Sequence, residues 1–241
     1  NKANIQAPDA VDASAHTYIG EEKGGIPNES DNGSAYLVKV STLPAISDNN
    51  PCYSRAGAEY EIYRKATPTA PNSGGTKMVN MTTADGKTLS KLTTNAAGVS
   101  ETVTLPVGYY YAKEVKAPKG FLLDSTPLPF PVTKGKTATI NAKDKPGNDP
   151  INILLRKDDS ELDKNAPQGG AALAGAEYTI KYYAGYYTEE DLSNGDAPVA
   201  IRTWVYETDA EGYINMSRAT PIRGDAVYRD EDNAVVIPVG T

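Results

Sequence analysis

Apolar and polar side chains alternate in short runs along most of the chain, which is the pattern of half-buried β-strands. The clearest run is 109–116, where one face carries Tyr110, Ala112 and Glu114 and the other face carries the residues between them. If the first face is the core, Glu114 is a buried acid. A buried carboxylate is costly unless it is protonated, paired or used in chemistry, so this glutamate is a candidate functional residue.

The first half of the chain contains further runs of this kind, separated by residues typical of turns. The predicted strands are 35–41, 56–63, 77–82, 91–94, 99–105, 121–124, 128–132 and 137–141. Short strands at this spacing predict an all-β sandwich. The segment 145–150 is rich in Pro and Gly, and we expect it to be a linker.

The second half repeats motifs of the first half. The segments Ala56–Ile62 and Ala174–Ile180 share the run Ala-Gly-Ala-Glu-Tyr, and a strand predicted at 151–155 opens the second copy. Two further pairs of segments correspond: Thr94–Gly98 with Thr208–Gly212, and Leu105–Tyr109 with Ile237–Thr241. This pattern indicates an internal duplication.

The duplication predicts two domains after a polar N-terminal tail or linker at 1–33. Domain 1 covers 34–146, and domain 2 covers 151–241 and lacks its C-terminal strands, because it ends where the counterpart of the Glu114 strand would begin. Three explanations stay open: the chain was cut, its end was not traced, or another chain supplies the strands.

Composition narrows the function classes. The net charge of −7 and the pI of about 4.9 argue against a nucleic-acid partner. No run is long and apolar enough to predict membrane insertion. Cys52 is the only cysteine, so an extracellular protein of this kind needs core burial or another covalent device in place of an intrachain disulfide. The single histidine, His16, lies in the predicted tail and supports neither a conventional metal site nor a Ser-His-Asp triad.

A family resemblance rests on the region around Glu114. The segments Leu105–Tyr109 and Ala117–Phe121, with Glu114 between them, resemble the "LPxGxYxxxExxAPxGY" box of Cna B-type (SpaA-like) domains. Those domains build the stalks and pilus shafts of Gram-positive surface adhesins. The resemblance covers roughly residues 35–241 and implies tandem immunoglobulin-like, prealbumin-like β-sandwiches. It also implies that the glutamate assists a spontaneous isopeptide bond between a lysine and an Asn or Asp.

The resemblance points to three residues for this chemistry. Lys39, flanked by Val38 and Val40, matches the first-strand lysine of the family; the alternative is a lysine whose charged head reaches the surface. Asp144 matches the acceptor position, with Asn141 as the alternative. These two have opposite strand parity, so only one should face inward unless a bulge intervenes. An Asp acceptor would release water and an Asn acceptor would release ammonia.

The second copy offers weaker candidates. Lys157 lies beside Asp158 at the end of its predicted strand, and we expect a solvated pair there. An aromatic-rich insertion follows at 181–192. We expect its aromatic residues to pack over a sheet edge. In the alternative, Tyr186, Tyr187 and Trp204 are ligand contacts that stack on sugar rings or grip a matrix protein.

Two further motifs carry little weight. Cys52 has no matching glutamine motif for a thioester, and the acidic run at 230–232 lacks the spacing of a calcium loop, so we expect a solvated turn. No cofactor is expected.

The resulting hypothesis is a non-enzymatic stalk or adhesion module of a bacterial cell-surface protein. It would be extracellular and anchored to the cell wall through regions outside this chain. Its partners would be other domains of the same adhesin, or host extracellular matrix or glycan. The alternatives are a module that itself binds such ligands and an accessory β-domain of a secreted enzyme.

Overall fold

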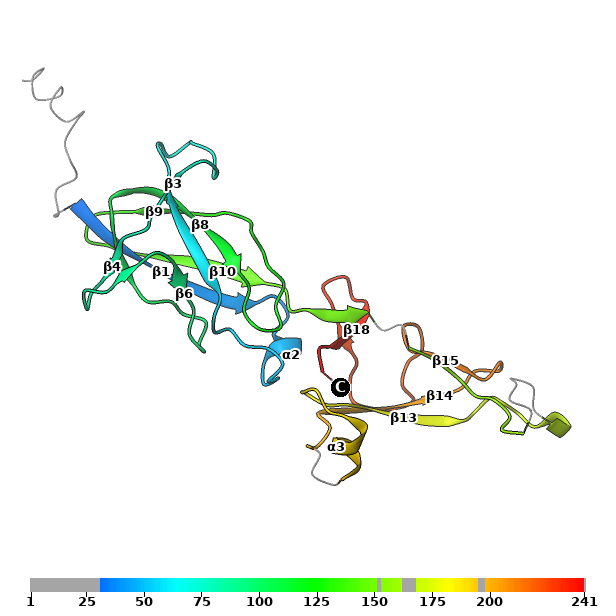
Figure 1. Cartoon of the computed structure of the whole chain (residues 1–241). Coiled ribbons are helices and arrows are strands. Elements are labelled where there is room, and N and C mark those ends of the chain that lie inside the picture. The colour runs from blue at the N-terminus through cyan, green and yellow to red at the C-terminus, as the bar shows by residue number, and fades with distance from the viewer. Residues whose placement is uncertain (1–30, 151–152, 162–167, 195–197, 241) are drawn as a thin grey trace, which may run out of the picture.

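The computed structural model describes residues 31–150, 153–161, 168–194 and 198–240. Most of the predicted tail, including His16, lies outside these residues. Strands dominate the described chain, and its helical segments are α2 (Pro44–Ser47), α3 (Glu189–Ser193) and a 3-10 turn at Gln168–Gly170. The prediction of an all-β fold is therefore confirmed (Figure 1).

The first unit is built from two facing sheets. One has the strand order β10-β1-β7-β4-β5, and the other has the order β3-β2-β8-β9 with β6 beside β2. The bounds are β1 (Asn32–Ser41), β2 (Glu59–Arg64), β3 (Thr76–Lys77), β4 (Met81–Thr83), β5 (Thr88–Leu89), β6 (Leu92–Thr93), β7 (Val103–Pro106), β8 (Gly108–Lys116), β9 (Leu128–Val132) and β10 (Thr137–Asp144).

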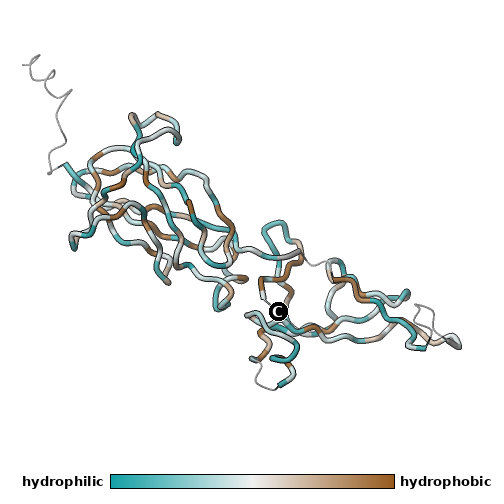
Figure 2. The backbone as a smooth tube through the Cα atoms, viewed as in Figure 1, coloured by the Kyte–Doolittle hydropathy of each residue, from teal (hydrophilic) through white to brown (hydrophobic). Residues whose placement is uncertain are grey.

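Alternation along these strands builds the core between the sheets. The buried cluster takes residues from both sheets, including Leu37 of β1, Ile62 of β2, Leu105 of β7 and Ala112 of β8. Figure 2 shows apolar segments recurring along the strands of this unit. The strands β1 and β10 lie side by side in parallel, with Lys39 opposite Ala142 and Ser41 opposite Asp144.

Three strand predictions need correction. The predicted strand 77–82 is divided between β3 and β4, which belong to different sheets. The other two corrections lie near the candidate residues. Residues 121–124 are not a strand; the chain there is irregular, with one isolated bridge between Phe121 and Pro146. The last strand does not end at Asn141 but continues to Asp144. Both changes matter for the site, because they place Asp124 in a loop and Asp144 in a sheet.

The second unit contains three smaller sheets. Their orders are β11-β18-β17, β12-β15 and β13-β14-β16. The bounds are β11 (Asn148–Pro150), β12 (Leu154–Arg156), β13 (Glu177–Tyr182), β14 (Arg202–Glu207), β15 (Tyr213–Asn215), β16 (Arg223–Gly224), β17 (Tyr228–Arg229) and β18 (Val235–Pro238). The predicted linker 145–150 therefore ends in a strand, since Asn148 pairs with Pro238.

The two copies share equivalent hydrogen bonds at corresponding positions, as the duplication predicts. The hydroxyl of Thr94 accepts from the backbone N–H of Ala58 at 3.1 Å, and that of Thr208 accepts from Ala176 at 2.9 Å. Likewise, the Lys39 N–H donates to the Gly98 carbonyl at 2.7 Å, as Lys157 does to Gly212 at 2.9 Å. Lys157 is thus the positional counterpart of Lys39.

The two units differ at their sheet edges. In the first, β2 pairs with β8 and β1 pairs with β10. In the second, β13 pairs with β14 and β12 pairs with β15. Within the described residues, no strand pairs with the other edge of β13 or with the other edge of β12. The described part of the second unit therefore has no counterpart of β8 or β10.

Candidate functional site

Lys39 lies on the core-facing side of β1. It continues the inward series of Ala35 and Leu37, and its side chain is 1% exposed. The backbone bond from Lys39 to Gly98 holds this part of the strand in place. The ammonium group of this lysine is therefore enclosed between the two sheets.

Glu114 faces the same space from β8. It shares the buried face of that strand with Tyr110 and Ala112 and is 1% exposed. Its Oε1 accepts a hydrogen bond from Lys39 Nζ at 2.7 Å, and its Oε2 accepts from the backbone N–H of Asp124 at 3.0 Å. Two donors from separate segments thus orient this carboxyl group.

Asp144 is the third member of the cluster and the last residue of β10. It is 1% exposed, and its Oδ2 contacts Lys39 Nζ as an ion pair but accepts no hydrogen bond. Asn141, the alternative acceptor, lies on the exposed face of β10 opposite Val38. Because side chains alternate along a strand, Asn141 points away from Lys39, and the structure does not bring it into the cluster.

Tyr60 also belongs to the site, and the sequence reasoning missed it. Its hydroxyl oxygen accepts from Lys39 Nζ at 3.0 Å, and Nζ lies 5.4 Å from the centre of its ring. The signal was present in the alternation of β2, but only the register of β2 against β8 brings Tyr60 opposite Glu114.

Burial governs the acid–base properties of the cluster. It raises the pKa of Asp144 to about 6; the positive charge of Lys39 opposes this rise, and the negative charge of Glu114 adds to it. Burial, together with the charges of Asp144 and Glu114, also raises the pKa of the Tyr60 phenol. Tyr60 therefore stays protonated at neutral pH, whereas Asp144 can gain or lose a proton there.

The arrangement has two chemical options. It can persist as a buried network of one ammonium group, two carboxyl groups and a phenol. It can also condense, because the lysine nitrogen is held against the carboxyl group of Asp144 and a second acid is within hydrogen-bonding distance to carry protons.

Trp204 lies in the core of the second unit and not on its surface. Its side chain is 2% exposed, its Nε1–H donates to the Ala226 carbonyl at 3.3 Å, and its ring packs edge-on against Tyr228. Tyr186 is 74% exposed, while Tyr187 packs against Tyr183 with 6.2 Å between ring centres. The expected aromatic set is therefore split between core and surface.

The remaining candidates have local structural roles. Asp158 pairs with Arg156 instead of Lys157, with Arg156 Nε donating to Oδ2 at 3.0 Å. Asp230 caps its own turn, since Oδ1 accepts from the backbone N–H groups of Asp232 and Ala234. Within the described ranges, no group of three or more His, Cys, Asp and Glu side chains could hold a metal ion.

Comparison with known proteins finds a family match within the first unit. Residues 54–146 match the family model of SpaA, described as a prealbumin-like fold domain. A search of curated proteins found no match. No helix of the described chain combines the length and apolar character that a membrane span requires.

Three similar solved structures come from Gram-positive bacteria. The TIE protein of Bacillus anthracis is 20% identical, with 87% of this chain and 29% of that chain covered and a TM-score of 0.44. The minor pilin GBS52 of Streptococcus agalactiae is 20% identical, with 51% and 48% covered and a TM-score of 0.38. The major pilin subunit BcpA of Bacillus cereus is 23% identical, with 51% and 31% covered and a TM-score of 0.34.

The chain thus spans less than half the length of each of these three structures. The family match contains the whole box around Glu114, and the strands of the first unit form the two facing sheets that the box predicted. Both the predicted family and the predicted fold class are confirmed: this chain contains a SpaA-type (Cna B-type), prealbumin-like domain.

Proposed function

We propose that this chain is a structural module of a bacterial cell-surface protein and that its first domain, 34–146, cross-links itself. The bond would be an isopeptide between Lys39 and Asp144, assisted by Glu114. One observation carries the proposal: an amine and two carboxyl groups from three different strands meet in a space closed to water.

The proposed reaction needs no external reagent. Glu114 accepts a proton from the Lys39 ammonium group, and the neutral nitrogen attacks the carboxyl carbon of Asp144. Glu114 then returns this proton to the departing oxygen of Asp144 and passes on a second proton that the nitrogen releases, so that the oxygen leaves as water and Glu114 ends as it began. One C–N bond forms, one C–O bond breaks and one water leaves. The hydrogen bond to Tyr60 restricts the lysine to the attacking position.

The bond would have a mechanical role. It joins β1 to β10, which are the first and last strands of the domain and lie in parallel. Force applied to the two ends of the domain would pass through the covalent link. The hydrogen-bonded strands between Lys39 and Asp144 would then carry little load, which suits a stalk.

Intact mass measurement tests the cross-link. We expect the purified chain to weigh one water less than its calculated mass, and peptide mapping to join Lys39 to Asp144. The variant Asn141→Ala is the matched control and should keep the water loss, whereas Asp144→Ala should lose it. A full calculated mass for the unaltered chain would contradict the proposal.

Ligand binding by the second domain, 151–241, is the other candidate function. The observation that favours it is the exposed ring of Tyr186. The ligands of such a module would be host matrix proteins or glycans, whereas a stalk would contact other domains of the same adhesin.

Binding assays with these ligands test the choice. Binding that Tyr186→Ala abolishes would favour ligand binding, and an absence of binding would favour the structural stalk. In either case we place the protein outside the cell, anchored to the cell wall by other regions.

A further inference from the structure

The long connection between β1 and β2 reaches the second unit. It contains α2 and residues 48–55, and Figure 1 shows α2 at the end of the first unit that faces the second. Its residues Ile46, Cys52 and Tyr53 belong to one buried cluster with Tyr182 and Trp204 of the second unit. The second unit's core is thus continued by side chains of the first.

Hydrogen bonds connect the same two partners. The Tyr53 hydroxyl donates to the Gly147 carbonyl at 2.5 Å and accepts from the Val239 N–H at 3.0 Å. Asn50 Nδ2 donates to the Tyr182 hydroxyl at 2.9 Å, which donates to the Val239 carbonyl at 2.8 Å. Both backbone groups of Val239 are therefore bonded to tyrosine hydroxyls, one from each unit.

These bonds are shielded from water. Asn50, Tyr53 and Tyr182 are all buried, and burial raises the pKa of the Tyr182 phenol. A buried polar group that loses its partner keeps its desolvation penalty, so breaking one bond of this network would weaken the contact noticeably.

The connection is also fixed on its own side. The N–H of Ser54 donates to the Lys119 carbonyl at 3.0 Å, and Lys119 Nζ donates to the Pro51 carbonyl at 2.9 Å. Gly120 has φ of +82°, and a Cβ there would lie 2.6 Å from the Cys52 carbonyl oxygen. The turn at 118–120, which follows β8, thus packs against this loop and holds it by hydrogen bonds.

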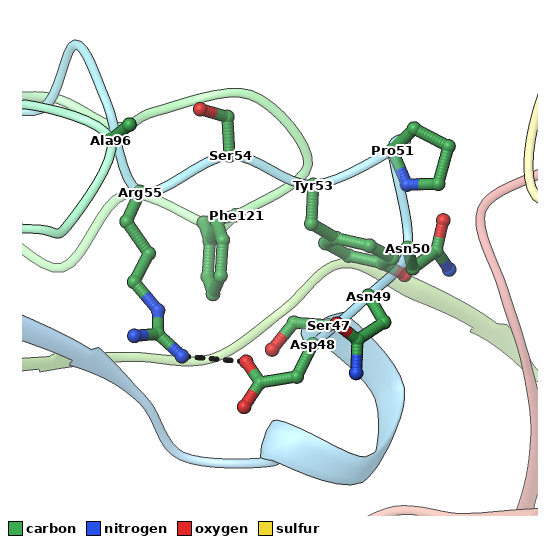
Figure 3. Close-up of a pocket in the computed structure, with 10 residues that line it drawn as sticks. All are labelled: Ser47, Asp48, Asn49, Asn50, Pro51, Tyr53, Ser54, Arg55, Ala96 and Phe121. Atoms are coloured by element: carbon green, nitrogen blue, oxygen red, sulfur yellow. Dashed lines mark hydrogen bonds and ion pairs between the residues drawn. The ribbon is translucent and has the colours of Figure 1, made fainter.

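Figure 3 shows the loop from the side of a cavity of about 590 Å³, with Tyr53 and Phe121 on its wall and Arg55 paired with Asp48. Tyr53 and Phe121 pack edge-on, with 5.7 Å between ring centres. The aromatic ring of Tyr53 is therefore held by the first unit while its hydroxyl group bonds the second.

We propose that residues 42–55 are an interdomain lock that fixes the second unit against the first in one orientation and completes its core. This inference goes beyond the cross-link and does not depend on it, because the bonds that join the two units come from Asn50 and Tyr53 and end on Gly147, Tyr182 and Val239. The lock meets the lysine cluster through a backbone bond, from the Thr42 N–H to the Asp144 carbonyl at 2.9 Å, which does not involve the Asp144 carboxyl group. The two units would then move together as one rigid body and would not reorient independently about a flexible linker.

The reactivity of the Cys52 thiol reports whether the lock is closed or open. It is the only cysteine of the sequence, is 3% exposed and lies in the shared cluster. Burial raises the pKa of its thiol, which further slows its reaction with thiol reagents. Labelling of Cys52 in the folded chain therefore measures how often the lock opens.

The experiment compares the labelling rate of the full chain with that of Tyr53→Phe and Asn50→Ala. Tyr53→Phe keeps the packed ring and removes only the bridging hydroxyl, so we expect labelling to rise about tenfold. Small-angle scattering should show a wider spread of interdomain distances. Tyr63→Phe is the matched control, since the Tyr63 hydroxyl bonds Glu61 on β2 and should not affect Cys52.

Three results would overturn the lock: both variants labelling at the unaltered rate, the control rising as much as Tyr53→Phe, or the unaltered chain labelling as fast as when denatured. Circular dichroism confirms that each variant is folded, and Asn50→Ala provides a second route if Tyr53→Phe does not fold. Intact mass on the same samples separates the two proposals, because a broken lock leaves the water loss unchanged.

Discussion

The two copies within this chain place the same local sequence in different surroundings. Leu37, Tyr60 and Ile62 of the first copy are fully buried, whereas their counterparts Leu155, Tyr178 and Ile180 are only partly buried. The first copy has β8, β9 and β10 packed against or beside these strands, and the described second copy has no such layer.

This difference extends to the lysines. Lys39 and Lys157 make the same backbone bond, yet Lys39 is sealed between two carboxyl groups and Lys157 is half-buried beside an aspartate that pairs with Arg156. A lysine at this position is thus not enclosed by its own strand alone. The layer that contains Glu114 and Asp144 excludes water and supplies the acids.

The largest expected effect comes from Lys39→Ala. It would prevent the proposed cross-link, which would close a loop of about 105 residues and by chain entropy contribute about 4–5 kcal/mol to the free energy of unfolding. We expect a clear fall in melting temperature and the full calculated mass for the variant. Glu114→Ala should behave alike, since the lysine would lack its proton acceptor. Unchanged melting in both variants would contradict the cross-link.

A smaller effect should follow pH in the unlinked protein. The pKa of Asp144 is about 6 in the folded chain and 3.8 ordinarily, and removing Lys39 takes away the charge that opposes the rise. The folded state then holds a proton that the unfolded state releases, so stability is lost as pH rises from about 4 through 6. Denaturation of Lys39→Ala should show a loss of at least about 3 kcal/mol as pH rises from about 4 to above 6, relative to Lys39→Ala/Asp144→Asn. Parallel pH curves for the two variants would refute this assignment.

Tyr60→Phe tests the residue that the sequence did not reveal. The substitution keeps the ring and removes the oxygen that accepts from Lys39, so we expect slower bond formation in freshly refolded protein. In the finished protein the loss of stability should be about 1 kcal/mol. The half-exposed Tyr109, changed to Phe, is the control and should affect neither quantity. Equal rates for Tyr60→Phe and the unaltered chain would remove Tyr60 from the mechanism.

Lys157→Ala should have the smallest effect. Its side chain is partly exposed and closes no loop, so we expect a change within about 0.5 kcal/mol by chemical denaturation and no effect on the water loss. A cost comparable to that of Lys39→Ala would show that the two lysines contribute equally to the stability of their copies.

The sequence by itself was sufficient to identify the core faces of the central strands. A period of two residues put Glu114 on the same strand face as Tyr110 and Ala112, and the family resemblance pointed to Lys39. The opposite parity of Asn141 and Asp144 meant that only one of them could join these two residues. The repeated Ala-Gly-Ala-Glu-Tyr run revealed the duplication. These inferences succeed because alternation is a local property of the backbone.

Tertiary structure decided everything that depends on pairing between distant segments. The role of Tyr60 follows from the register of β2 against β8, and Asp124 meets Glu114 only because 121–124 is a loop. Trp204 is a core residue because Tyr228 covers it, and Tyr53 joins the two units through a loop that looked unremarkable in sequence. Burial and contact depend on which strands and loops meet, and strand periodicity carries no information about that choice.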